Sequence, residues 1–129
     1  MKNSQNKILN YINLDDYKPF DFSIPSIKLN IIINKSIVKI TSEYKLIKEN
    51  IFTNKISLKG RDIKINKILL NNIELKDDLY LKKDDELIIN SINNKENILR
   101  IESSIIPENN SSLLGMYESN GIITTQCEA

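Results

Sequence analysis

The stretch IKLNIIINKSIVKITSEYKL, residues 27–46, decides the fold class. Its first half alternates apolar with mostly polar side chains, and the apolar series is Ile27, Leu29, Ile31 and Ile33. Its second half repeats the period with the series Val38, Ile40, Ser42, Tyr44 and Leu46. Successive side chains of a β-strand point to opposite faces, so the pattern predicts a strand with one buried face over 27–33 and a long return strand over 38–46. Asn34-Lys35 predicts a turn between them, which makes a hairpin.

Beyond this hairpin the chain carries further short apolar series separated by turn residues. Strands are predicted over residues 56–58, 63–69, 73–75, 79–81, 87–89, 99–105 and 122–128. Asn71-Asn72 is expected to form a tight hairpin turn because asparagine tolerates a positive φ, and residues 109–119 are expected to form a loop with a short helical turn. The sequence therefore predicts an all-β fold, a sandwich or open β-saddle of about seven to eight short strands, mostly antiparallel.

Length and charge limit the domain organisation and the partners. The 129 residues suit a single domain, with a polar lead-in over 1–14 and the β domain over 15–129. The net charge is +1, and the lysines are scattered, so no basic stripe favours nucleic acid. The N-terminus lacks the apolar stretch of a signal peptide, and no run approaches the ~20 apolar residues of a membrane span. A single cysteine excludes an internal disulfide. We therefore expect a cytoplasmic protein that binds neither nucleic acid nor membrane.

The last residues, Thr124-Thr125-Gln126-Cys127-Glu128-Ala129, contain the candidate site. In an extended strand, Gln126 and Glu128 share one face and Cys127 lies on the other. A carboxylate beside an amide can bind a charged amino group through hydrogen bonds of about 1.5–3 kcal/mol each. Cys127 is interpreted as a small packed side chain, because the sequence has no histidine to activate it as a nucleophile. Spacing alone favours ordinary residues at a frayed terminus, because Gln-x-Glu is a common pattern.

Three groups of residues resemble a known family. Residues 109–119 together with 123–129 closely resemble the pattern N-T-A-L-E-G-L-Y-x-S-G and C-T-Q-C-E-A of bacterial aminopeptidase N, a zinc aminopeptidase of the gluzincin type. Residues 16–22 are similar to its D-Y-x-x-P-D-[FY], and residues 56–65 to its L-x-L-[ND]-G-x-x-L-x-L. The departures are Met116 for leucine, the additional Asn120, and Thr124 for the first cysteine.

The resemblance implies the N-terminal domain of such an enzyme, a β-rich saddle. It assigns Glu128 to the substrate's free α-amine and Gln126 to the lining of the same pocket. In that family the zinc ligands and the general base lie in a following catalytic domain, so the expected partners are that domain and a peptide N-terminus. A hydrolytic zinc site needs three protein ligands, usually including histidine, and this sequence has none. The resemblance therefore implies no cofactor in this chain, zinc in the full-length enzyme, and no activity for the chain alone.

Other interpretations remain open at this stage. The chain could be a stand-alone β-sandwich binding module or a decayed gene remnant, and composition alone favours a binding scaffold. Carboxylate pairs such as Asp15-Asp16, Asp77-Asp78 and Asp84-Asp85 are interpreted as solvated turns rather than acid/base dyads. Paired isoleucines such as Ile31-Ile32 indicate either strands buried on both faces or a general overuse of isoleucine. If part of the surface meets a catalytic domain, the chain by itself would expose an apolar patch and open strand edges.

Overall fold

The computed structural model of the chain describes residues 13–34, 36–83 and 85–127. The described residues form ten strands and three short 3-10 turns. The strands are β1 (Phe22–Asn34), β2 (Ile37–Lys48), β3 (Ile56–Lys59), β4 (Lys64–Leu70), β5 (Ile73–Glu74), β6 (Tyr80–Lys83), β7 (Glu86–Ile89), β8 (Glu96–Ile105), β9 (Gly115–Ser119) and β10 (Ile122–Gln126). The 3-10 turns are η1 (Leu14–Asp16), η2 (Asp77–Leu79) and η3 (Pro107–Asn109). The all-β class is confirmed.

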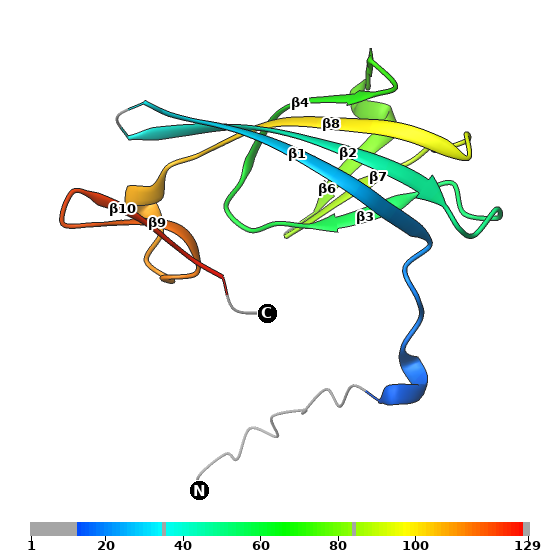
Figure 1. Cartoon of the computed structure of the whole chain (residues 1–129), viewed down its shortest axis with the longest axis horizontal. Coiled ribbons are helices and arrows are strands. Elements are labelled where there is room, and N and C mark those ends of the chain that lie inside the picture. Colours follow the sequence, from blue (N-terminus) through cyan, green and yellow to red (C-terminus); the bar gives the residue numbers. More distant parts are fainter. Residues whose placement is uncertain (1–12, 35, 84, 128–129) are drawn as a thin grey trace, which may run out of the picture.

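The strands form three sheets (Figure 1). A five-stranded sheet has the order β1-β2-β8-β4-β5, and a three-stranded sheet has the order β3-β7-β6. Strands β9 and β10 pair only with each other, as a hairpin that follows η3. Every pairing in the described residues is antiparallel. The two larger sheets make the predicted sandwich, and the hairpin is an appendage to it.

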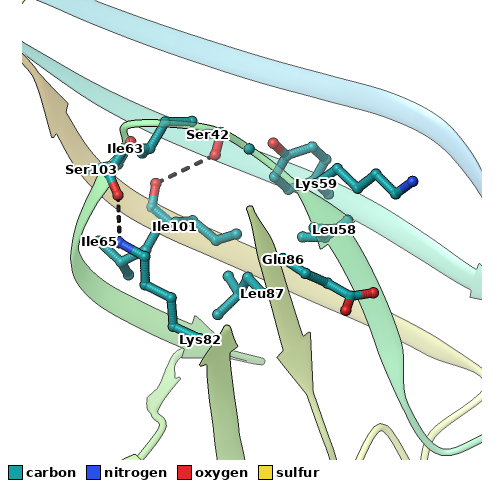
Figure 2. A pocket seen from close by; sticks show the side chains of 12 residues that line it. Ser42, Leu58, Lys59, Ile63, Ile65, Lys82, Glu86, Leu87, Ile101 and Ser103 are labelled. Atoms are coloured by element: carbon teal, nitrogen blue, oxygen red, sulfur yellow. Dashed lines mark hydrogen bonds between the residues drawn. The ribbon is translucent and has the colours of Figure 1, made fainter. Parts of the chain in front are cut away.

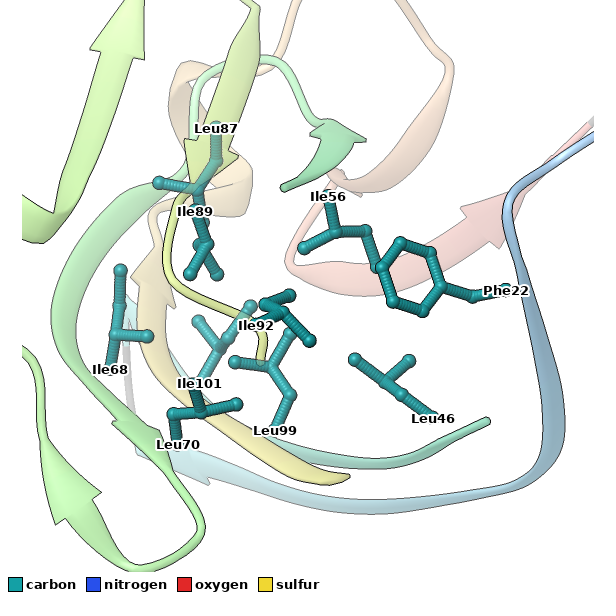
Figure 3. Close-up of a cluster of buried hydrophobic side chains, with 10 residues drawn as sticks. All are labelled: Phe22, Leu46, Ile56, Ile68, Leu70, Leu87, Ile89, Ile92, Leu99 and Ile101. Carbon is teal, nitrogen blue, oxygen red and sulfur yellow. The ribbon is translucent and has the colours of Figure 1, made fainter. Parts of the chain in front are cut away.

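The hydrophobic core lies between the two larger sheets (Figure 3). Its buried members are Phe22, Leu46, Ile56, Ile68, Leu70, Leu87, Ile89, Ile92, Leu99 and Ile101. The central strand β8 supplies two of them, and its side chains alternate between buried and half-buried from residue 97 to residue 104, as the period of two predicts. Lys48, which is 7% exposed, donates from Nζ to the carbonyl oxygen of Ile92 at 2.6 Å and so ties the loop before β8 to the end of β2.

The hairpin of β1 and β2 is confirmed, but the predicted burial of one β1 face is wrong. The register pairs Ile27 with Tyr44 and Ile33 with Val38, so the apolar row of β1 shares the face of β2 that forms the core. Nevertheless Ile27, Leu29, Ile31 and Ile33 are 53%, 61%, 45% and 56% exposed. These residues lie on the outermost strand of the five-stranded sheet, and none of them belongs to the buried core that the three-stranded sheet covers.

Local turn chemistry explains the connection from β4 to β5. Asn71 and Asn72 have φ values of 52° and 65°, so the predicted turn with two positive φ angles is confirmed. The Asn71 side chain accepts the backbone N–H of Ile98 at 2.8 Å and donates to the Asn97 side chain at 3.0 Å. The turn is thereby fastened to β8, which positions the edge of the five-stranded sheet.

The paired isoleucines do not mark strands buried on both faces. Ile31 and Ile32 are both exposed, at 45% and 52%. Ile89 is fully buried, but its neighbour Ile88 is only half-buried. Of the two open interpretations, the structure favours the general overuse of isoleucine.

Candidate functional site

The candidate site lies on the hairpin of β9 and β10. The connection between the strands is Asn120-Gly121, with φ values of 52° and 78°. An Asn-Gly pair with two positive φ angles is the preferred two-residue hairpin turn, because its twist matches that of the flanking strands. Residues 115–119 are therefore a strand, and the prediction of a loop over the whole of 109–119 is wrong for this part.

The register decides which side chains share a face with Gln126. Gln126 lies opposite Gly115, and Thr124 lies opposite Tyr117. Because opposite residues and residues two apart share a face, the hydroxyl groups of Tyr117 and Thr124 lie on the Gln126 face. Glu128, the predicted partner of Gln126, lies outside the described residues.

The other face of the hairpin carries a different set of groups. Glu118 lies opposite Ile123, and Thr125 lies opposite Met116. Alternation therefore places the Glu118 carboxylate on the side away from Gln126. Among the described hairpin residues, no carboxylate shares the Gln126 face.

Gly115 leaves the space opposite Gln126 open. Its φ is +79°, which favours glycine, and a Cβ added there would meet no heavy atom within 4 Å. Gln126 itself is exposed. Its side-chain amide, which offers both an acceptor and a donor group, is therefore free of cover from the opposite strand.

Asn110 fastens the start of β9 to the segment after η3. Its side-chain nitrogen donates to the carbonyl oxygens of Leu114 at 2.7 Å and Met116 at 2.9 Å. Its side-chain oxygen accepts the backbone N–H of Ser112 at 3.0 Å and the Ser112 hydroxyl at 2.7 Å. One asparagine side chain thus links the backbone from residue 110 to residue 116. These hydrogen bonds fix the shape of the segment in place of apolar burial.

The hairpin buries little, since its most covered side chains, Met116, Tyr117, Ile123 and Thr124, are only half-buried. No residue of β9 or β10 is buried, and Ile122 is 67% exposed. Leu113 and Leu114, just before β9, are 56% and 53% exposed. An isolated two-stranded hairpin is marginally stable in water and normally needs an apolar face packed against something else. The Leu113–Leu114 pair and Ile122 are therefore candidates for contact with another part of a larger assembly.

Cys127 is exposed, so the interpretation of this residue as a packed side chain is wrong for the chain by itself. It immediately follows β10, which is a strand of an uncovered two-stranded sheet. Packing of Cys127 would require a surface that the described residues do not supply.

The groups with shifted pKa values lie away from the hairpin. Hydrogen bonds from Arg100 and Lys28 lower the pKa of Glu43 on β2, and the hydrogen bond to Asp77 raises the pKa of Tyr80 on β6. Arg100 donates to Glu43 at 2.6 Å across the exposed face of the five-stranded sheet. These are surface ion pairs and hydrogen bonds of the sandwich, and they add no titrating group to the candidate site.

The acidic pairs occur in turns, as the solvated interpretation predicts. Asp15-Asp16 lies in η1 and Asp77-Asp78 in η2, and all four residues are exposed. Asp85 pairs with Arg61 at 3.0 Å, while Asp84 lies outside the described residues. Over residues 13–34, 36–83 and 85–127, no three histidine, cysteine, aspartate or glutamate side chains come together as metal ligands. No helix in that part of the chain has the length and apolar character of a membrane span.

A cavity of about 110 Å³ opens between the two larger sheets (Figure 2). Two of its polar side chains are already engaged, since Lys82 Nζ donates to the Ile63 carbonyl oxygen at 2.7 Å and the Ser42 hydroxyl to the Ile101 carbonyl oxygen at 3.4 Å. No residue of β9 or β10 lines it. This cavity is not connected to the candidate site.

The chain is similar to aminopeptidases in sequence and in fold. It is 28% identical over 118 residues to aminopeptidase N of Caulobacter vibrioides, a match that covers 92% of this chain and 14% of that protein. It matches the crystal structure of Legionella pneumophila aminopeptidase A, solved in complex with aspartic acid, with a TM-score of 0.78 and 24% identity, covering 90% of this chain and 14% of that one. No family model matches.

These matches confirm the resemblance inferred from the sequence motifs. The sequence similarity extends over nearly the whole chain, and the structural match shows that the fold is shared. The chain spans about 14% of the length of the relatives it matches. It is therefore similar to one small part of an aminopeptidase.

Proposed function

We propose that the chain is the N-terminal domain of a zinc aminopeptidase that removes N-terminal amino acids from peptides. In this proposal the domain forms one side of the active-site cleft and supplies Gln126 and Glu128 to the pocket for the substrate's α-amine. The sequence similarity to aminopeptidase N supports the proposal. The observation that carries it is the uncovered hairpin, which presents Gln126 opposite the bare backbone of Gly115.

The chemistry of the site suits an ammonium group. A carboxylate attracts the positive charge, and the carbonyl oxygen of the Gln126 amide accepts a second hydrogen bond from the same group. Only a free N-terminus offers such an ammonium at the end of the peptide. The two side chains would therefore restrict cleavage to the first peptide bond of the substrate.

The hydrolytic chemistry is assigned to a second, catalytic portion of the enzyme. The chain's own residues do not fit a zinc site, because the sequence has no histidine and the described residues contain no cluster of potential ligands. The chain alone is expected to be inactive. We place the enzyme in the cytoplasm, which is consistent with a single cysteine and no possible internal disulfide.

The catalytic portion is proposed to dock where the hairpin exposes its apolar residues. Leu113, Leu114 and Ile122 are the large apolar residues exposed there. Burial of these side chains would stabilise the hairpin, since each fully buried aliphatic side chain contributes about 1.5–3 kcal/mol. The same contact would bring Gln126 to the edge of the cleft.

Amide hydrogen exchange tests this docking. In the isolated chain, the amides of β9 and β10 are expected to exchange rapidly, because a hairpin with no fully buried residue opens readily. In the longer enzyme their protection is expected to rise by at least about 100-fold. The amides of β8, which lies in the middle of the sandwich, serve as the internal control and should be equally protected in both samples. Equal exchange of β9 and β10 in the two samples would reject the docking.

A further inference from the structure

Strand β1 has an open edge. It is the last strand of the five-stranded sheet, spans 13 residues, and pairs only with β2 among the described residues. An uncovered edge presents a row of N–H and C=O groups that can pair with another strand. Proteins usually protect such edges with proline, charged residues or bulges.

The protection of this edge is confined to its beginning. Pro25 lies at the register shift between Ser23 and Ser26, so the strand is irregular there. From Ser26 to Asn34 the register is continuous and contains no proline. The single charged residue in that segment is Lys28. Its ammonium group is paired with Glu43 at 3.3 Å, and this pairing weakens the protection that its charge gives against pairing with another strand.

The same segment carries the exposed apolar row. Ile27, Leu29, Ile31 and Ile33 are between 45% and 61% exposed, and they share one face of the strand. An edge that combines free backbone groups with a continuous apolar row is a site for strand addition. The proposed contact with a catalytic portion uses the other end of the chain and leaves this edge unexplained.

We propose that β1 pairs edge to edge with β1 of a second copy of this chain. When two strands pair antiparallel, the numbers of any two residues that lie opposite each other add up to the same value. With a sum of 60, Ile27 faces Ile33, Leu29 faces Ile31, and Asn30 faces Asn30 of the second copy. All four apolar residues then lie opposite apolar residues, and the two-fold axis passes between the two copies of Asn30.

Charge is also compatible with this register. Lys28 faces Ile32 rather than its own copy, so no like charges lie directly opposite each other. Lys28 also keeps Glu43 as its partner on the neighbouring strand. One strand thus provides both halves of a self-complementary contact, which favours a second copy over an unrelated partner. The result would be a ten-stranded sheet with five strands from each copy.

The oligomeric state of the chain and of two charge variants tests the proposal. Analytical ultracentrifugation of the unmodified chain is expected to show a species with twice the mass of one chain. L29K/I31K would place like charges opposite each other and is expected to raise the dissociation constant of the dimer by at least about 100-fold. L29K/I31E removes the same apolar residues but places opposite charges face to face, so it should retain the dimer. Both positions of change are exposed strand sites, so folding should be preserved, as circular dichroism can verify.

A cross-link tests the register itself. In a Cys127→Ser background, Asn30→Cys is expected to form an intermolecular disulfide, because opposite Cα atoms in antiparallel strands are about 4.5–5.5 Å apart, within the range of a disulfide. Asn34→Cys is the control, since its two copies would be roughly 27 Å apart along the strands.

A monomeric unmodified chain would overturn the proposal, and so would loss of the dimer in both charge variants or a cross-link at residue 34 instead of residue 30. A dimer in the isolated chain that is absent from a longer enzyme would assign the edge to another part of that enzyme and would equally overturn it.

Discussion

In the proposed aminopeptidase that would contain this chain, replacing Glu128 by glutamine is expected to lower kcat/KM for an aminoacyl substrate by about 10–100-fold. The substitution keeps the size and the hydrogen-bonding shape of the side chain but removes its negative charge. In the proposed pocket, the ion pair with the substrate's ammonium would become a hydrogen bond to a neutral amide, and the lost stabilisation corresponds to about 1.4–2.7 kcal/mol at roughly 1.4 kcal/mol for each factor of ten. The measurement is steady-state kinetics with a substrate that has a free α-amine.

Glu118→Gln provides a matched control for this experiment. It makes the same chemical change on the hairpin of β9 and β10, where Glu118 shares its face with Ile123 and not with Gln126. Its effect on kcat/KM is expected to be less than about threefold. If Glu128→Gln left the catalytic efficiency unchanged, or if both variants lost the same amount, the assignment of Glu128 to the amine pocket would be refuted.

Replacing Leu99 by alanine is expected to lower the free energy of unfolding of the chain by about 2–5 kcal/mol. Leu99 is fully buried in the core cluster, on strand β8, which pairs with β2 on one side and β4 on the other. Truncation there removes apolar contacts and leaves a cavity. The cavity cannot readily collapse, because hydrogen bonds to β2 and β4 hold β8 in place on both sides. A loss of this size is a large fraction of the stability of a small domain. Urea unfolding monitored by circular dichroism measures it.

Leu81→Ala is the corresponding control in the same protein. Leu81 lies on β6 and is 53% exposed, so the same truncation should cost less than about 1 kcal/mol. Equal losses for Leu99→Ala and Leu81→Ala would contradict the placement of the core between the two larger sheets.

Local signals in the sequence predicted much of the fold. The alternation over residues 27–46 and the turn chemistry of Asn71-Asn72 depend only on neighbours in the chain, and the structure has both hairpins. The burial of β1 could not be predicted in this way. Whether Ile27 to Ile33 are covered depends on how far the three-stranded sheet extends across the five-stranded one, and the sequence period carries no information on that distance.

The candidate site was only partly predictable for a related reason. Gln126 was identified from its motif, but Tyr117 and Thr124 were not, because they join its face only once β9 is recognised as a strand. The signal was present in Asn120-Gly121, an Asn-Gly turn between two short alternating segments. Cys127 was expected to be packed because no histidine can activate it as a nucleophile, yet the surface against which it would pack is not part of the described chain.

The most direct test of the central claim is the effect of Gln126 on catalytic efficiency in the proposed enzyme that would contain this chain. Gln126→Ala removes the amide that the hairpin presents opposite Gly115, and Thr125→Ala changes the adjacent residue on the opposite face. For a substrate with a free α-amine, we predict that Gln126→Ala lowers kcat/KM by about tenfold and that Thr125→Ala leaves it unchanged. The same kcat/KM for both variants and the unmodified enzyme would contradict the account.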